Sequence, residues 1–118
     1  MSEPSSAEQD TTFDLAALTR TIRAGDGYAR DGHGARTLVR ADDLRIVLVA
    51  MKEGAVIKEH RVRITASVHA LEGRVRLQLP ERAVEVAAGS VLVIPPDVPH
   101  DVQALEESAF LLTLGWKG

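Results

Sequence analysis

The 118-residue chain contains no cysteine. This absence excludes disulfide bonds, thiolate metal sites, iron–sulfur clusters and cysteine nucleophiles. Only four residues are aromatic. The chain has 14 Lys and Arg and 17 Asp and Glu, which gives a net charge of -3. The chain has little excess of basic side chains to neutralise phosphates and few aromatic side chains to stack on bases, so we expect no nucleic-acid partner. Any chemistry has to come from histidine, acids, hydroxyl groups or the shape of a pocket.

Long apolar runs are also missing, since no segment approaches the roughly 18 residues that span a bilayer. The N-terminus, MSEPSSAEQDTT, is acidic and rich in serine, whereas a secretory signal peptide is basic and then apolar. We therefore expect a cytoplasmic protein with no membrane partner. With 45% hydrophobic and 26% charged residues, the composition is that of a globular protein. The length suits one domain.

The chain divides into three segments. Residues 1–12 have too few apolar side chains to offset the entropy of ordering, and we expect a disordered tail. Residues 13–35 hold an amphipathic helix that Asp14 can cap, followed by the glycine-rich stretch GDGYARDGHG, which we interpret as a loop. In residues 36–118 the hydrophobic pattern changes to a period of two, which is typical of β-strands.

This last segment predicts an all-β fold. Short apolar or alternating runs are separated by turn residues such as Asp-Asp, Glu-Gly and Pro-Pro-Asp, a spacing typical of a β-sandwich or barrel. The predicted strands are RTLVRAD, LRIVLVAMK, AVIKEH, RITASVHAL, GRVRLQLP, RAVEVAAG, SVLVIP, HDVQAL and SAFLLTLGW. The last run is apolar on both faces, so it lies centrally in a sheet or is covered by a second subunit.

Two spaced motifs lie within these strands. Gly54 is followed after five residues by His60, and Gly73 comes after twelve more. Gly89 is followed after five residues by Pro95, and His100 comes after four more. This pattern resembles the cupin family, whose two motifs read G-x5-H-x-H-x3-E-x6-G and G-x5-P-x-G-x2-H-x3-N. The resemblance implies a small cupin jelly-roll β-barrel with a short N-terminal helix.

The resemblance also implies a metal site that is degenerate in this chain. In metal-binding cupins the two histidines and the glutamate of the first motif and the histidine of the second hold one divalent ion. Only His60 and His100 are retained, because Val62 and Ala66 stand at the other two positions. Aliphatic side chains cannot coordinate a metal. The cofactor is therefore either absent or a divalent transition metal held by His60 and His100.

His69 is a further candidate ligand. In a strand, side chains alternate between faces, so His69 points away from the face that Ala66, Val68 and Ala70 share. A β-bulge is the one local feature that would reverse this. We expect the ligand pocket to be lined by His60, His100, Val62, Ala66, Val68 and Met51.

These residues favour a metal-free or metal-poor module that binds a small organic ligand as a sensor or accessory protein. The alternative is a metal-dependent cupin oxygenase, isomerase or decarboxylase with His60 and His100 as ligands. An acid–base enzyme without metal also stays open, since a pocket histidine is a competent general base. No catalytic residue is assigned. Because cupins often pair through a sheet face, the resemblance also implies a homodimer.

Overall fold

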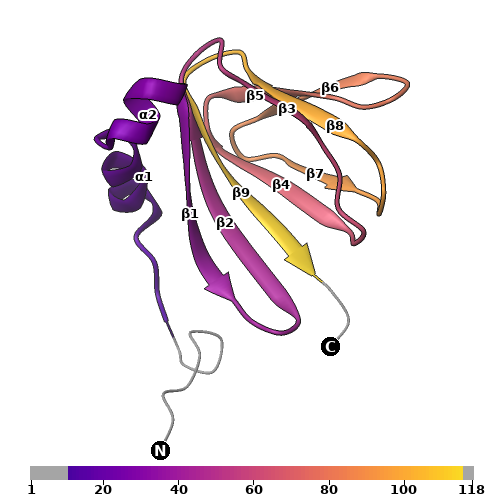
Figure 1. Ribbon diagram of the computed structural model, residues 1–118, viewed down its shortest axis with the longest axis horizontal. Helices are drawn as coiled ribbons and strands as arrows, with labels where there is room; N and C mark the ends of the chain where they lie inside the picture. Colours follow the sequence, from indigo (N-terminus) through magenta and orange to yellow (C-terminus); the bar gives the residue numbers. More distant parts are fainter. Residues whose placement is uncertain (1–10, 116–118) are drawn as a thin grey trace, which may run out of the picture.

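The computed structural model describes residues 11–115, apart from the side chains of Glu59 and His60. Two helices precede nine strands (Figure 1). Their bounds are α1 Leu15–Arg23, α2 Asp26–Asp31, β1 His33–Arg40, β2 Leu44–Met51, β3 Val56–His60, β4 Ala66–Glu72, β5 Arg74–Gln78, β6 Ala83–Ala87, β7 Val91–Ile94, β8 His100–Ala104 and β9 Ser108–Gly115. Residues 1–10 of the expected disordered tail lie outside the described residues.

The strands form two antiparallel sheets. The larger sheet has the order β1-β2-β9-β4-β7 and the smaller one β3-β8-β5-β6. Each of the nine predicted runs overlaps one strand, so the predicted all-β class is confirmed. The apolar run near the C-terminus forms β9, which pairs with β2 on one side and β4 on the other. Its central position explains why both of its faces are apolar, while the homodimer stays a prediction.

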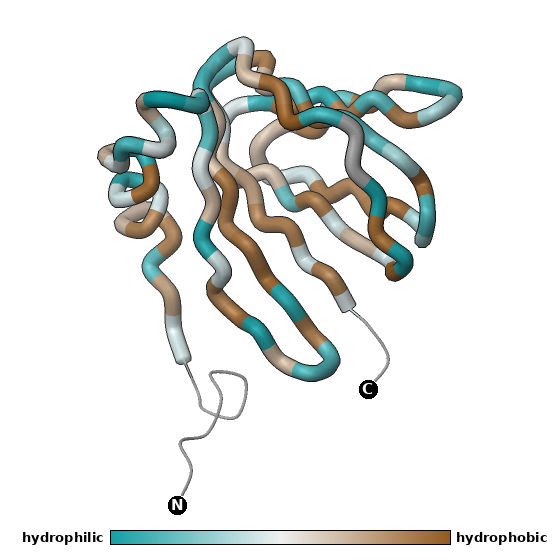
Figure 2. The backbone as a smooth tube through the Cα atoms, in the orientation of Figure 1, coloured by the Kyte–Doolittle hydropathy of each residue, from teal (hydrophilic) through white to brown (hydrophobic). Residues whose placement is uncertain are grey.

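The core lies between the two sheets. In β5 the exposed and buried residues alternate strictly, with Val75 and Leu77 fully buried. Figure 2 shows this alternation along the smaller sheet, whereas β2 and β9 carry longer hydrophobic stretches. Each strand therefore sends one set of apolar side chains inward, as the period of two predicts.

Helix α1 confirms the predicted amphipathic helix and its cap. Asp14 accepts a hydrogen bond from the backbone N–H of Ala17 at 3.0 Å. Arg23, in the last turn, bonds to Glu72 of β4 at 3.2 Å and donates to the carbonyl of Ser108 at 3.3 Å. These contacts attach the helix to the larger sheet. Neither of the described helices is long and apolar enough to span a membrane.

The expectation that the glycine-rich stretch before residue 36 is a loop is wrong. Residues Asp26–Asp31 form the short helix α2, and β1 begins at His33. The helix forms because Tyr28 is buried, and because Gly32 ends it in a left-handed conformation at φ 80°. Composition alone favoured a loop, since glycine is a poor helix former, but burial of one aromatic side chain outweighs that propensity.

The three motif glycines, Gly54, Gly73 and Gly89, all have positive φ, as expected for tight turns. Gly73 is also crowded. A Cβ atom there would meet the carbonyl oxygen of Glu107 and lie 2.5 Å from the hydroxyl of Ser108. Ser108 is fully buried, and its hydroxyl accepts a hydrogen bond from the Arg74 N–H at 3.0 Å. The turn between β4 and β5 therefore packs directly against the start of β9.

We predict that Gly73→Ala and Gly89→Ala destabilise the protein to different degrees. Both positions require a left-handed backbone, which costs a non-glycine residue about 1–2 kcal/mol. Only Gly73 adds a steric clash, since nothing lies within 4 Å of a Cβ at Gly89. Urea unfolding should show a loss of about 3 kcal/mol or more for Gly73→Ala and about 1–2 kcal/mol for Gly89→Ala. Equal losses would contradict the close packing of this turn.

Candidate functional site

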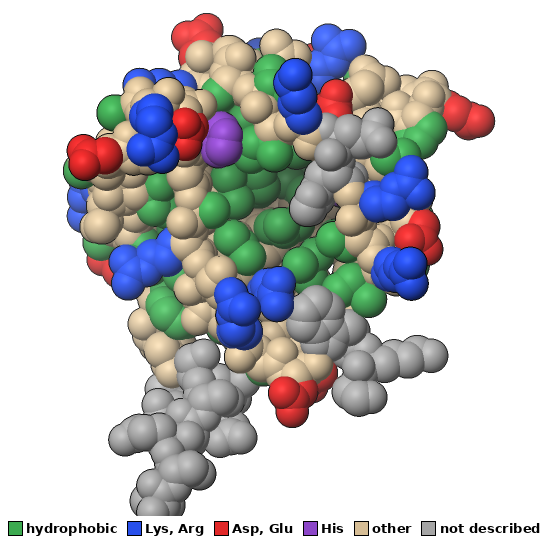
Figure 3. Space-filling model, viewed as in Figure 1, with side chains coloured by type: hydrophobic (Ala, Val, Ile, Leu, Met, Phe, Trp, Pro, Cys, Tyr) green, Lys and Arg blue, Asp and Glu red, His purple; other side chains and the backbone are tan. Residues whose placement is uncertain are grey.

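A cavity of about 180 Å³ lies between the two sheets. The larger sheet contributes four lining residues and the smaller sheet three: Val49, Val68, Phe110 and Leu112, then Ile57, His100 and Val102. In the space-filling view, hydrophobic side chains gather in a hollow in the middle of the molecule (Figure 3). The cavity is therefore apolar, with one exception in its described lining, His100.

The strand register explains where the cavity lies. We call a set of inward-facing register partners across the larger sheet a row. One row runs from Val49 to Phe110 and Ala70, and the next runs from Val47 to Leu112 and Val68. Valine and alanine are small, so the two middle rows do not fill the space between the sheets.

His100 begins β8, and its side chain shares the inward face with Val102 and Ala104. It is only 5% exposed. The ring lies with Nδ1 3.1 Å from the carbonyl oxygen of Val98. A carbonyl can only accept, so Nδ1 is the donor of this bond and carries a proton. The bond orients the ring within an otherwise apolar lining.

His60 is the register partner of His100, across the pair β3 and β8. The register shifts between Ile57 and His60, so a bulge precedes the histidine. The structure thus brings the two predicted histidines together along the backbone of adjacent strands. The side chain of His60 lies outside the described residues.

The other predicted pocket residues occupy different places. Val68 lines the cavity. Ala66 and Met51 are buried and face inward, but each lies one row away from the cavity, in opposite directions along the strands. Val62 is half-buried in the segment between β3 and β4. None of these three belongs to the described lining.

Sequence reasoning missed five lining residues: Val49, Ile57, Val102, Phe110 and Leu112. Each lies in a predicted strand, and the period of two gives the face on which it stands. That period does not say how far along the barrel axis a residue lies. The missing information is the register between strands distant in sequence.

His69 lies on the outer face of the larger sheet, as its alternation with Val68 and Ala70 predicts. Its register partners are Leu111 and Val91, and the side chain is half-buried. In the described pairing of β4 with β9 the register shifts after Ala70, so this irregularity does not reverse the face of His69. His69 is therefore not a ligand of a site between the sheets.

The described donors do not fit a metal site with three protein ligands. Among the described side chains, no group of three His, Asp or Glu residues is close enough to hold an ion. Aliphatic Val62 and Ala66 stand where the family pattern has a histidine and a glutamate. A stable site of first-row metals needs at least three suitable donors.

The loop before His100 is held in place by its backbone. Asp97, which stands at the glycine position of the second motif, has φ 64°. Aspartate is one of the few non-glycine residues that adopt this conformation. The N–H of Asp97 donates to the carbonyl of Val62 at 2.8 Å. This bond joins the loop at 95–99 to the segment that follows β3.

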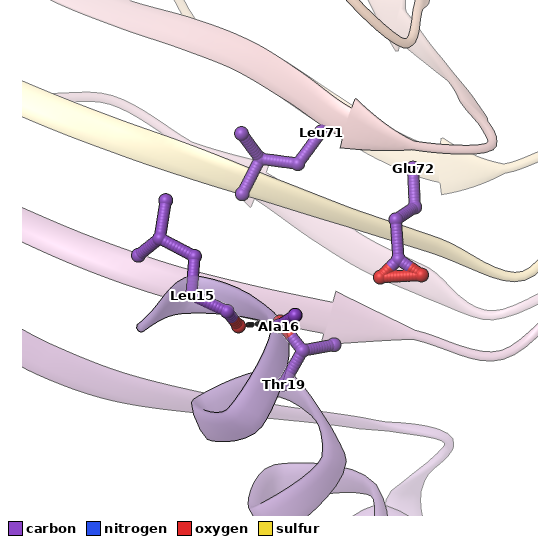
Figure 4. A pocket seen from close by; sticks show the side chains of 5 residues that line it. All are labelled: Leu15, Ala16, Thr19, Leu71 and Glu72. Carbon is purple, nitrogen blue, oxygen red and sulfur yellow. Dashed lines mark hydrogen bonds between the residues drawn. The ribbon is translucent and has the colours of Figure 1, made fainter. Parts of the chain in front are cut away.

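A second pocket, of about 190 Å³, lies outside the barrel between α1 and the end of β4 (Figure 4). It is lined by Leu15, Ala16, Thr19, Leu71 and Glu72. Its polar groups are already used, because the Thr19 hydroxyl donates to the carbonyl of Leu15 at 2.7 Å and Glu72 pairs with Arg23. The cavity between the sheets is the better candidate site.

The family comparison agrees with the fold and motifs. The model of the cupin domain family matches residues 47–114. This match covers more than half of the chain and includes both motifs, so the protein belongs to the cupin family. A search of curated proteins finds no match.

Solved structures support the same fold. A conserved protein of unknown function from Streptococcus pyogenes is 27% identical, with a TM-score of 0.76 over 100% of this chain and 97% of that chain. A cupin superfamily protein from Desulfitobacterium hafniense has the same TM-score at 17% identity, over 92% and 94%. A cupin 2 conserved barrel domain protein from Leptotrichia buccalis is 23% identical, with a TM-score of 0.75 over 88% and 47%.

We predict that neutral His100 is the Nδ1–H tautomer, because Nδ1 donates to the Val98 carbonyl. Long-range ¹H–¹⁵N correlation spectra at high pH should show a protonated Nδ1 and an unprotonated Nε2 for this ring. A His100→Gln variant identifies the signals by their disappearance. Signals of the Nε2–H tautomer, or of two exchanging tautomers, would contradict the assigned bond.

Proposed function

We propose that the protein binds a small organic molecule in the cavity between its two sheets and acts as a sensor or accessory module without a metal. The observation that carries this proposal is an apolar cavity of about 180 Å³ whose described lining has one polar side chain, His100. Pockets of this kind gain affinity from apolar contact and specificity from a few polar groups.

The size of the cavity indicates the size of the ligand. An engineered apolar cavity of about 150 Å³ stays dry and binds benzene. The cavity between the sheets is slightly larger, so a ring or a chain of about six carbons fits. The bond to Val98 orients the His100 ring, so the apolar cavity has one polar side chain in a defined position.

The alternative is a metal-dependent cupin enzyme. It is favoured by one observation, the register pairing of His60 with His100. Two imidazoles hold a first-row ion only loosely, and the described residues add no third donor. The binding module is therefore the better supported of the two functions.

We predict that Val68→Phe abolishes ligand binding. The phenyl ring would extend from β4 into the space between Phe110 and His100 and occupy it. Val93→Phe is a matched control, because Val93 is 59% exposed on the outer face of the adjacent strand β7. NMR titration with toluene should give millimolar or tighter binding for the wild type and the control, and none for Val68→Phe. Unchanged binding by Val68→Phe would place the ligand elsewhere.

We also predict that the protein, purified without tag or chelator, contains far less than one transition-metal ion per chain. Elemental analysis of the wild type beside a His60→Ala, His100→Ala double variant gives the comparison. The two proteins should have the same low content. Near-stoichiometric metal that disappears in the double variant would support the enzyme instead.

A further inference from the structure

A polar groove crosses the outer face of the smaller sheet, away from the cavity between the sheets. Two hollows of about 320 Å³ each adjoin there, because the linings of both include Gln78 of β5 and Asp101 of β8. The first hollow is also lined by Val56, Arg76 and Gln103. The polar residues of β5 and β8 alternate with buried positions, so they face away from the core.

The groove contains two register pairs of different polarity. Arg76 is the register partner of Gln103, and Gln78 is the partner of Asp101. The amide nitrogen of Gln78 donates to the carbonyl of Leu79 at 2.9 Å, so its side-chain oxygen remains as an acceptor. The Gln78–Asp101 pair therefore presents acceptors, whereas the guanidinium of the other pair presents only donors.

The two charges in this groove have no counter-charge within the part of the chain that the structure describes. Ion pairs join Arg74 of the same sheet to Glu85 (Nη1 to Oε1, 3.6 Å) and to Glu106 (Nη2 to Oε2, 3.3 Å). Glu85 is the register partner of Arg76, but its ion pair is with Arg74. Neither Arg76 nor Asp101 belongs to a described ion pair. Asp101 is half-buried, so its carboxylate gives up part of its hydration without a protein partner.

We propose that this groove binds a free α-amino acid with an apolar side chain. Arg76 binds the carboxylate of the amino acid, because its guanidinium supplies planar, paired donors. Asp101 and the side-chain oxygen of Gln78 bind the ammonium group. The groove lies outside the barrel, so this inference is independent of the ligand proposed for the cavity.

The spacing of the two pairs suits an α-amino acid. Positions two residues apart on one face of a strand are separated by about 7 Å. A charge-assisted hydrogen bond at each end takes up about 2.8 Å. The two charges of the ligand therefore lie within a few ångströms of each other. The second hollow, whose lining includes Leu79, Pro80 and Pro99, adjoins the Gln78–Asp101 pair and receives the apolar side chain.

The experiment compares L-leucine with two analogues that each keep one charge. Leucinamide lacks the carboxylate, and N-acetylleucine lacks the ammonium group. Dissociation constants are measured by NMR titration at about pH 6, where an α-amino group is protonated, for the wild type, Arg76→Gln and Asp101→Asn. Arg36→Gln and Asp42→Asn are matched controls, because these exposed residues lie in β1 and in the turn that follows it.

We expect the wild type and both controls to bind leucine with a dissociation constant of about 1 mM, and each analogue about threefold to tenfold more weakly. Arg76→Gln should bind leucine and leucinamide equally, and Asp101→Asn should bind leucine and N-acetylleucine equally. Equal binding of leucine and the analogues by the wild type, or a preference that persists in the two variants, would overturn the inference. So would a wild type that does not bind leucine at concentrations about ten times higher. The proposed function, which is tested with toluene in the cavity, stands in each case.

Discussion

The structure depends on how inward-facing side chains fill the space between two sheets. Packed sheets are separated by about 10 Å, and the gap closes only where the residues on both faces are large enough. Here the row at one end of the cavity is filled by Met51, which is fully buried. The middle rows consist of valine, alanine and leucine beside one phenylalanine, and they leave a cavity. The location of the site is therefore a result of side-chain volume.

His100 acquires a defined chemistry from this setting. In water an imidazole exchanges freely between tautomers, but a ring that is 5% exposed and bonded to the carbonyl of Val98 has one preferred tautomer. The loop that supplies this carbonyl is itself held, because Asp97 bonds to the backbone of Val62. The backbone near Val62 thus supports the site, although its aliphatic side chain cannot coordinate a metal.

The amino-acid sequence predicts the sheet face on which a residue lies better than it predicts the row to which the residue belongs. Alternation placed nine strands and the outward direction of His69 correctly, because the period of two is a local property. Met51 and Ala66 have the inward face that was predicted, but they lie in rows beyond the cavity, and Phe110 and Leu112 replace them. The row in which a residue lies depends on the pairing of β9 with β2 and β4, and this pairing joins residues far apart in the sequence. Helix α2 was missed because burial of Tyr28 is a tertiary effect.

The central claim is that a small molecule occupies the space between the sheets. The most direct measurement is a set of intermolecular nuclear Overhauser effects between toluene and the isotopically labelled protein. The account predicts contacts from the ligand ring to the methyl groups of Val49, Val68 and Val102, with none to Val91 or Val93 on the outer face. Contacts confined to the outer face, or to Leu15 and Leu71 beside α1, would contradict it.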